Sequence, residues 1–375
     1  MSRWASGEKT LYFCPIRNTL ISYDGLSSYF LDGLFSGKST EFLRQELSSH
    51  LDIDPAKLDI AEQNARAFFD TGFEFPRQIL EYEKNFVGWQ PPENLRHKLH
   101  LNFRSHVVRF TCDSLDLVQA LQESLSSYLV NNANDLLEVG SDASLYAYSD
   151  DGAYVVGDGT HCYQAKVDLD QVRTFVLGRL FNIYFRALHF EFVFHAAGVR
   201  HEQIDWLLPA ESGSGKSTLV KYLADNGAYA YTDDNLLLDD SFSPMPTQLP
   251  FCVKEGVWQT LGLYPSVHEQ YRRLDGRKFI LDWPANGDNI PDSRAKASVV
   301  IVPKYQADTK FSVQEIDLAD KVMAFTNSGY LQRDMSKSDL IPKWVDWIKE
   351  IKGYEICYSH CDEVINWMTD YATSI

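Results

Sequence analysis

Apolar residues near the N-terminus change from a strand pattern to a helical one. Residues 10–21 are rich in aromatic and β-branched side chains, which predicts one or two short strands. Gly33 closes the first helix that follows, and Gly72 ends the last one, as a terminating glycine does. Apolar residues recur at helical spacing between these points, so three helices are expected over 25–33, 40–50 and 56–71.

The middle of the chain is β-rich. Residues 74–96 are polar and contain three prolines, which makes them the best linker candidate. From 98 to 167, alternating apolar positions predict several strands and one helix over 115–129. A long helix over 168–188 is expected next. The pattern therefore divides the chain into three domains, 1–85, 86–167 and 168–375.

Two apolar strands follow the long helix and form an expected antiparallel hairpin. They cover 192–199 and 204–209, and the four residues between them suit a tight connection. If Val199 pairs with Ile204, His195 lies opposite Leu208 and close to the segment that follows the second strand. A single histidine in an apolar strand is more often a hydrogen-bonded core residue. The position of His195 in the hairpin makes a functional role about equally favoured.

A small-residue loop joins the second strand to a helix. Gly213, Gly215, Lys216 and Ser217 lie in the order that a phosphate-binding loop requires, whereas Ala210 occupies the place of its first glycine. Glycines let backbone N–H groups turn toward a polyphosphate, and the helix N-terminus favours an anion. A lysine in this place reaches the β- and γ-phosphates, and a serine hydroxyl binds Mg²⁺. A chance small-residue turn is the alternative.

Two aspartates are expected beside this loop. Roughly ten helical residues lead about 15 Å away from it, and the strand over 228–232 returns about 16 Å. Asp233 and Asp234 follow at once. One carboxylate can bind the Mg²⁺ that bridges the phosphates, and the other can accept a proton from an attacking hydroxyl. An Asp-rich turn without function is the alternative.

Composition narrows the function classes. The chain has 375 residues, 45% of them apolar, and a net charge of −17. An acidic surface argues against nucleic acid and against an anionic membrane as partners. No apolar run approaches the roughly 18 residues of a membrane span, and no signal peptide is recognisable. The scattered cysteines indicate reduced thiols and a cytoplasmic location; they are Cys14, Cys112, Cys162, Cys252, Cys357 and Cys361.

The loop, the aspartate pair and the histidine together resemble the HPr kinase superfamily, whose members phosphorylate a serine with ATP. The family's loop pattern is matched by residues 210–217, its Asp-Asp pair by 233–234 and its upstream histidine by His195, without a gap. The resemblance implies an α/β P-loop kinase domain with a mixed sheet. It makes Asp234 the base, with His195 orienting it or touching the γ-phosphate. It assigns Mg²⁺ to Ser217 and Asp233, and ATP to Ser212, Gly213, Ser214, Gly215, Lys216, Ser217 and Thr218.

The chain also departs from the HPr kinases proper. Their long signature after the aspartates is missing, which puts the reverse, phosphate-removing reaction in doubt. Residues 250–258 instead resemble a looser branch, the HPr-kinase-related kinases that include those modifying lasso peptides. There Lys254 would add positive charge at the transferred phosphate, and Glu255 would be a second metal ligand. A solvated Lys-Glu pair is as good an interpretation. The basic stretch 271–278 either closes over phosphates, holds an acidic peptide or forms a solvated hairpin.

The N-terminal segment resembles the PqqD-like peptide-recognition domain, a small winged-helix module of enzymes that modify ribosomally made peptides. The matching pieces are residues 26–33, 41–47 and 68–73. A generic small helical domain is the alternative. The expected architecture is therefore a winged-helix-like α+β domain, a β-rich lobe and an HPr kinase-type domain.

The expected function is ATP- and Mg²⁺-dependent phosphorylation of a Ser/Thr hydroxyl on a peptide or protein, such as a ribosomally made precursor. The alternatives are a kinase of small-molecule hydroxyls (free serine or a sugar), a nucleotide-binding regulatory protein without catalysis, and a kinase of HPr itself. The missing signature stands against the last. Neither the acceptor, a preference for ATP over GTP, nor a homo-oligomeric state can be read from the sequence.

Overall fold

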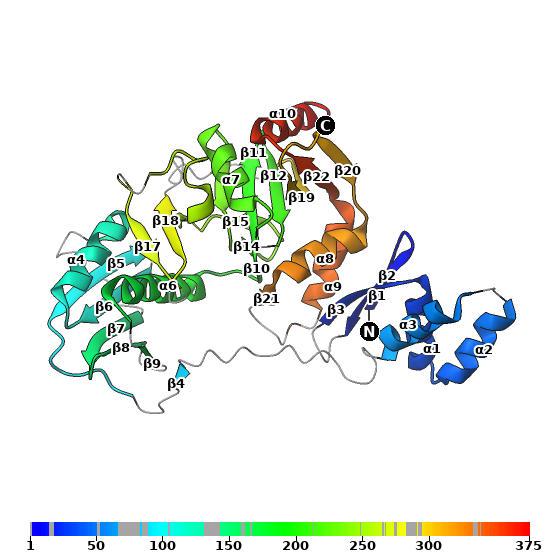
Figure 1. Cartoon of the computed structure of the whole chain (residues 1–375), viewed down its shortest axis with the longest axis horizontal. Helices are drawn as coiled ribbons and strands as arrows, with labels where there is room; N and C mark the ends of the chain where they lie inside the picture. The colour runs from blue at the N-terminus through cyan, green and yellow to red at the C-terminus, as the bar shows by residue number, and fades with distance from the viewer. Residues whose placement is uncertain are drawn as a thin grey trace. The chain divides into compact units, whose positions relative to one another are not determined.

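The chain folds into a mixed α/β structure (Figure 1). In its described part, the computed structural model contains nine α-helices and five sheets. It describes residues 2–14, 19–50, 53–66, 83–84, 89–103, 106–130, 143–158, 162–165, 167–211, 213–247, 249–264, 266, 268–273, 276–282, 291, 295–332, 337 and 339–375.

The chain separates into two compact units. Unit 1 combines Met1–Pro76, Phe190–Phe251 and Trp283–Ile375, and unit 2 combines Arg77–His189 with Cys252–Asp282. These units follow other boundaries than the expected 1–85, 86–167 and 168–375. The long helix expected at 168–188 groups with the β-rich lobe, and the N-terminal segment groups with the expected phosphate loop.

The N-terminal module of unit 1 has the expected order of strands and then helices. Asp24 caps the first helix by accepting a hydrogen bond from Ser27 N, 2.7 Å away. That helix runs on through Gly33, so the expectation that Gly33 closes it is wrong. The glycine instead makes room for Leu43, because a Cβ at Gly33 would lie 2.5 Å from its methyl groups. The elements are β1 (Ser2–Ser6), β2 (Lys9–Cys14), β3 (Thr19–Asp24), α1 (Gly25–Phe35), α2 (Thr40–His50) and α3 (Pro55–Arg66). Gly72 lies outside the described residues.

Successive side chains of β2 point to opposite faces of its sheet, and one of these faces packs on the core of unit 1. Tyr12 points to the helices and packs with their apolar residues. Leu11 and Phe13 point the other way and join a buried cluster that contains Phe194 and Trp344. The three-stranded sheet is thus sandwiched between its own helices and the rest of unit 1.

The main sheet of unit 1 is six-stranded and mixed. Its order is β13-β11-β12-β19-β22-β20, in which β12, β19 and β22 are parallel and the other pairings are antiparallel. These strands are β11 (Ala196–His201), β12 (Ile204–Pro209), β13 (Tyr229–Thr232), β19 (Ala297–Tyr305), β20 (Ser312–Glu315) and β22 (Lys352–Tyr358). The helices of this part are α7 (Lys216–Asp225), α8 (Leu318–Ser328), α9 (Leu340–Glu350) and α10 (Cys361–Thr373).

The hairpin of β11 and β12 is tighter than expected. Val199 pairs with Trp206 and not with Ile204. The turn consists of Glu202 and Gln203 alone, and both have positive φ (49° and 63°), as a two-residue type I′ turn requires. The true register brings Ala196 opposite Pro209. His195 therefore lies nearer to the phosphate loop than the expected pairing with Leu208 would place it.

The strand expected over 192–199 is broken at His195. Residues 192–194 form β10, which pairs with β14 (Leu236–Leu238) and β21 (Tyr330–Gln332) in a second, four-stranded sheet. This sheet is completed by β15 (Pro244–Met245). His195 is thus the joint where the chain passes from one sheet to the other.

Unit 2 is built on another six-stranded sheet, which α4 (Leu115–Ser124) and α6 (Leu169–Ala187) contact. The helix expected over 115–129 ends as α4 at Ser124, and a 3₁₀ turn over Ser126–Tyr128 follows. Asp168 and Gln171 form a capping box at the start of α6. The sheet consists of β4 (Glu83–Lys84), β5 (His97–Phe103), β6 (His106–Cys112), β7 (Ala143–Asp150), β8 (Ala153–Gly157) and β9 (Cys162–Ala165).

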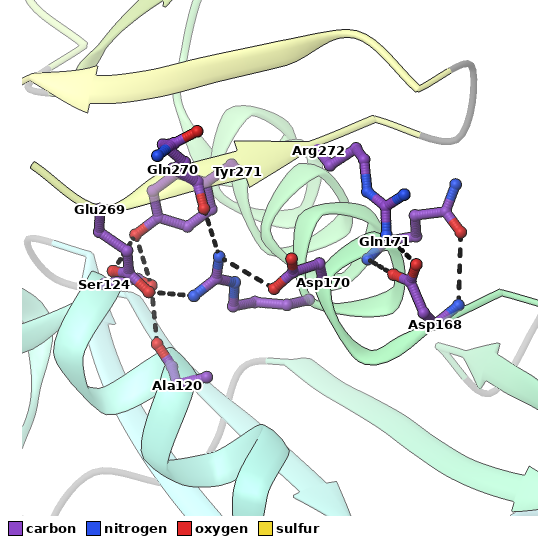
Figure 2. Close-up of polar contacts among 10 residues, drawn as sticks. Ala120, Ser124, Asp168, Asp170, Gln171, Glu269, Gln270, Tyr271 and Arg272 are labelled. Atoms are coloured by element: carbon purple, nitrogen blue, oxygen red, sulfur yellow. Dashed lines mark hydrogen bonds and ion pairs between the residues drawn. The ribbon is translucent and has the colours of Figure 1, made fainter. Parts of the chain in front are cut away.

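The basic stretch 271–278 is a hairpin of β17 (Gln270–Arg272) and β18 (Lys278–Asp282) that is tied into unit 2. Figure 2 shows Arg272 beside Asp168, and the Tyr271 hydroxyl within hydrogen-bond distance of both Ser124 and Glu269. The buried Arg173 pairs with Glu269, and its guanidinium lies 4.3 Å from the Tyr271 ring centroid. These contacts favour the hairpin interpretation; residues 274–275 lie outside the described residues.

None of the helices in the described part of the chain is both long enough and apolar enough to cross a membrane.

Candidate functional site

The expected phosphate loop lies between β12 and α7. Gly213 and Gly215 both have positive φ, 96° and 89°, a conformation that side chains disfavour. Ser214 N donates to Glu211 O at 3.3 Å, which closes a turn in the loop. Ser212 was expected to bind the nucleotide but lies outside the described residues. The two glycines thus adopt backbone conformations that other residues disfavour.

The N-terminus of α7 follows the loop directly. Gly215 is its N-cap, and in the part of the chain that the structure describes no side chain caps the helix and no acidic residue occupies its first turn. The positive end of the helix dipole at such an N-terminus favours a negatively charged group. Ser217 and Thr218, expected as nucleotide contacts, lie in this turn and are half-buried.

Lys216 is buried, with 6% of its surface exposed. Its ammonium group donates to His195 O at 3.2 Å and to Ala210 O at 3.5 Å. The lysine thus connects His195 with the beginning of the loop. Ala210, which occupies the place of the first glycine in the loop pattern, supplies one of the two carbonyl acceptors.

His195 and Asp234 face each other. Nδ1 of His195 lies 3.1 Å from Oδ1 of Asp234, and the side chains are 36% and 44% exposed. The backbone N–H of His195 donates to Gly329 O at 2.8 Å, which holds the joint in place. The pair can reach a substrate, because neither side chain is enclosed.

The pair forms where two segments of the chain leave the regular strands. Phe194 pairs with Leu236 in the four-stranded sheet, and Gly198 pairs with Thr232 in the six-stranded sheet. Between these pairs the chain passes from one sheet to the other twice, once at His195 and once over residues 233–235. His195 and Asp234 therefore both lie outside the regular strands.

Thr232 shapes the aspartate corner. Its hydroxyl accepts hydrogen bonds from the backbone N–H groups of Asp234 at 3.2 Å and of Asn235 at 3.1 Å. Asp233 is 5% exposed, whereas Asp234 is half-exposed. The two carboxylates thus have different surroundings, as two different tasks would require. Thr232 was not expected from the sequence, although a threonine directly before an Asp-Asp pair is a recognisable turn signal.

The metal assignment stays a prediction. In the described ranges, no three His, Cys, Asp or Glu side chains form a group that could hold a metal ion. Mg²⁺ commonly binds through one or two protein oxygens together with phosphate oxygens. The Ser217 hydroxyl and the Asp233 carboxylate are donors of this type.

Lys254 and Glu255 lie elsewhere in the chain. Lys254 ends β16 (Phe251–Lys254), Glu255 begins a short 3₁₀ helix (Glu255–Val257), and both are exposed in unit 2. Their expected roles at the phosphate and at the metal remain predictions. Within unit 1, Lys216 contacts the His195 carbonyl, and the His195 ring contacts Asp234.

No protein-family model and no curated protein matches this chain.

Proposed function

We propose that this protein is an ATP- and Mg²⁺-dependent kinase that phosphorylates a Ser/Thr hydroxyl on a peptide or protein. The observation that carries the proposal is the 3.1 Å approach of His195 to Asp234, combined with the contact of Lys216 with the His195 carbonyl. A phosphate-binding loop and a carboxylate–histidine pair are thereby linked through one lysine. A protein that only bound a nucleotide would not need the second feature.

The proposed chemistry is positioning and charge neutralisation. The loop N–H groups and Lys216 hold the β- and γ-phosphates. The acceptor hydroxyl oxygen forms a bond to the γ-phosphorus while the bond to the β,γ-bridging oxygen breaks, and the hydroxyl proton passes to Asp234. His195 orients the Asp234 carboxylate. Mg²⁺, held by Ser217 and Asp233, would neutralise charge on the phosphates.

The finer fold assignment belongs to this proposal as well. A mixed sheet with a loop-helix after a central strand supports an HPr kinase-type domain, and a small sheet followed by three helices supports a PqqD-like module. In that case, the N-terminal module would select a precursor peptide, and the enzyme would act in the cytoplasm.

A transfer assay tests the function. The purified protein is incubated with Mg²⁺, γ-labelled ATP and a library of peptides that contain serine or threonine, beside a matched library in which alanine replaces both. We expect label only in the first library. Label on free serine or a sugar, with none on peptides, would instead establish a small-molecule kinase. ATP binding without any transfer would leave a regulatory nucleotide binder.

Binding is measured separately by calorimetry. Lys216→Ala removes the ammonium group from the phosphates and should weaken ATP binding at least about tenfold, equivalent to one lost charged contact of about 1.5–3 kcal/mol. Lys343→Ala, which removes an exposed lysine on α9, is the matched control. Equal affinities for the two variants would contradict the phosphate-loop assignment.

A further inference from the structure

Tyr305 stands at the edge of the sheet where the phosphate loop begins. It is the last residue of β19, the parallel neighbour of β12, and Val300 of β19 pairs with Leu207 of β12. Parallel neighbours present their carboxyl ends at one edge of a sheet, where open α/β folds bind their ligands. Tyr305 therefore follows its strand at the same edge as the loop follows β12.

Direct contacts attach Tyr305 to the loop. Its backbone N–H donates to Ser214 O at 3.2 Å. A methyl group placed on Gly215 would lie 2.9 Å from Cβ of Tyr305. The side chain thus starts beside the N-cap of α7, yet 55% of the residue is exposed. A large aromatic side chain that remains uncovered at a ligand-binding edge has a free face to offer.

Tyr358 packs against the ring of Tyr305. It ends β22, is only 1% exposed, and its ring meets that of Tyr305 edge to face at 5.8 Å and 68°. Its hydroxyl has no hydrogen-bond partner among the residues that the structure describes. The hydroxyl lies 2.9 Å from the point that a Cβ of Gly215 would occupy. A buried hydroxyl without a partner is costly, so its position against the loop is a second sign that this edge is arranged around a ligand.

We infer that the exposed face of Tyr305 is the platform on which the base of the bound nucleotide stacks. The inference rests on the proposed function, because the loop must first hold the phosphates. An aromatic ring contacts the face of a base and does not read its edge. Removal of the ring should therefore weaken ATP and GTP by the same factor.

Calorimetry with two ligands isolates the base. ADP carries phosphates and a base, whereas inorganic tripolyphosphate carries phosphates alone. Stacking on an aromatic side chain contributes about 1–3 kcal/mol per base, so Tyr305→Ala should weaken ADP about 5- to 150-fold. Tripolyphosphate binding should stay within about twofold, and Tyr305→Phe should retain the affinity for ADP. Phe42→Ala removes an aromatic side chain of similar exposure from α2 and serves as the control.

The outcomes separate the two proposals. If Tyr305→Ala binds ADP as tightly as the unmodified protein, or weakens tripolyphosphate as much as ADP, the platform is refuted while the phosphate site stands. If the unmodified protein binds neither ligand, the proposed function itself fails. A second readout is the fluorescence of Tyr305→Trp, measured against the unmodified protein. We expect it to change on addition of ADP and to stay constant with tripolyphosphate, and a constant signal with both would oppose stacking.

Discussion

His195 and Asp234 approach to 3.1 Å because two chain segments cross between two sheets at the same place. Neither residue belongs to a regular strand, and each is held by its backbone: His195 N donates to Gly329 O, and Asp234 N donates to the Thr232 hydroxyl. The pair is therefore positioned by the sheets and left accessible by the break between them. This arrangement suits the acid–base role proposed for Asp234.

Asp234→Asn should abolish phosphoryl transfer and leave nucleotide binding intact. The amide keeps the size of the side chain but cannot accept the hydroxyl proton at neutral pH, and general-base catalysis contributes about 10²- to 10⁴-fold. The transfer rate is measured with labelled ATP, and ADP affinity by calorimetry. Asp240→Asn, in the exposed turn after β14, is the control and should keep the full rate. A fully active Asp234→Asn variant would remove Asp234 from the role of base.

The effect of His195 should depend on Asp234. If the histidine acts by orienting the carboxylate, His195→Ala lowers the rate in the unmodified background and has little further effect when combined with Asp234→Asn. Residues that act as a unit show such non-additivity. The double-mutant cycle is read from transfer rates at saturating ATP. Fully additive losses would indicate that His195 contacts the phosphates independently.

The local pattern of the sequence was sufficient for the loop. Gly213 and Gly215 have positive φ, and a helix begins directly after them, as expected. The loop backbone and the start of a helix depend on neighbouring residues. The adjacency of His195 to this region was also expected, but from a wrong register. Arg200 and His201 extend the hairpin, and the sequence alone does not predict this. The register depends on Glu202 and Gln203, which adopt positive φ in the two-residue turn.

Long-range packing could not be predicted from the sequence. The N-terminal module was expected to be a separate domain, yet Leu11 and Phe13 alternate with Tyr12 and enter the core beside Phe194. Periodicity identifies a strand with two apolar faces but not the partner of each face. In the same way, the apolar run over 297–303 predicts a strand, whereas the position of Tyr305 against Gly215 depends on strand order.

Gly215→Ala should weaken nucleotide binding more than Gly213→Ala does. Both glycines have positive φ, so both substitutions introduce backbone strain of about 1–3 kcal/mol. At Gly215 the new methyl would also meet Tyr305 and Tyr358 at 2.9 Å, whereas at Gly213 no atom of the described residues lies within 4 Å. ADP affinity is measured by calorimetry and the fold by circular dichroism. Equal affinities for the two variants would show that the tyrosines do not restrict the loop.

Removal of the N-terminal module should unfold unit 1, so its role has to be tested by point substitution. Truncation would expose Phe192 and Phe194 to water and remove the hydrogen bond from Ala319 N to the Ser6 hydroxyl, 2.8 Å long. Phe13→Ala should already lower the free energy of unfolding by about 3–5 kcal/mol. Phe42→Ala should change it by about 0.5 kcal/mol or less, as an exposed position does. A truncated protein that stays soluble and cooperative in urea would contradict this packing.

Lys321 of α8 is a buried lysine that binds the C-terminal end of α9. It is 5% exposed and donates to Ile348 O at 2.7 Å and to Ile351 O, which are carbonyls at the C-terminal end of α9. Lys321→Met leaves these acceptors without their donor and should lower the free energy of unfolding by about 1–3 kcal/mol. Lys343→Met, an exposed ion-pair residue on α9, should cost less than about 1 kcal/mol.

Burial also lowers the pKa of Lys321 from its usual 10.5. Between the lowered pKa and 10.5, the unfolded chain binds more protons than the folded protein, so the stability contributed by Lys321 rises with pH across this window. The difference in urea midpoint between the unmodified protein and Lys321→Met should therefore grow from pH 7 toward pH 10. A difference that shrinks over this range would mean that the two carbonyls hold the ammonium group more strongly than burial opposes it.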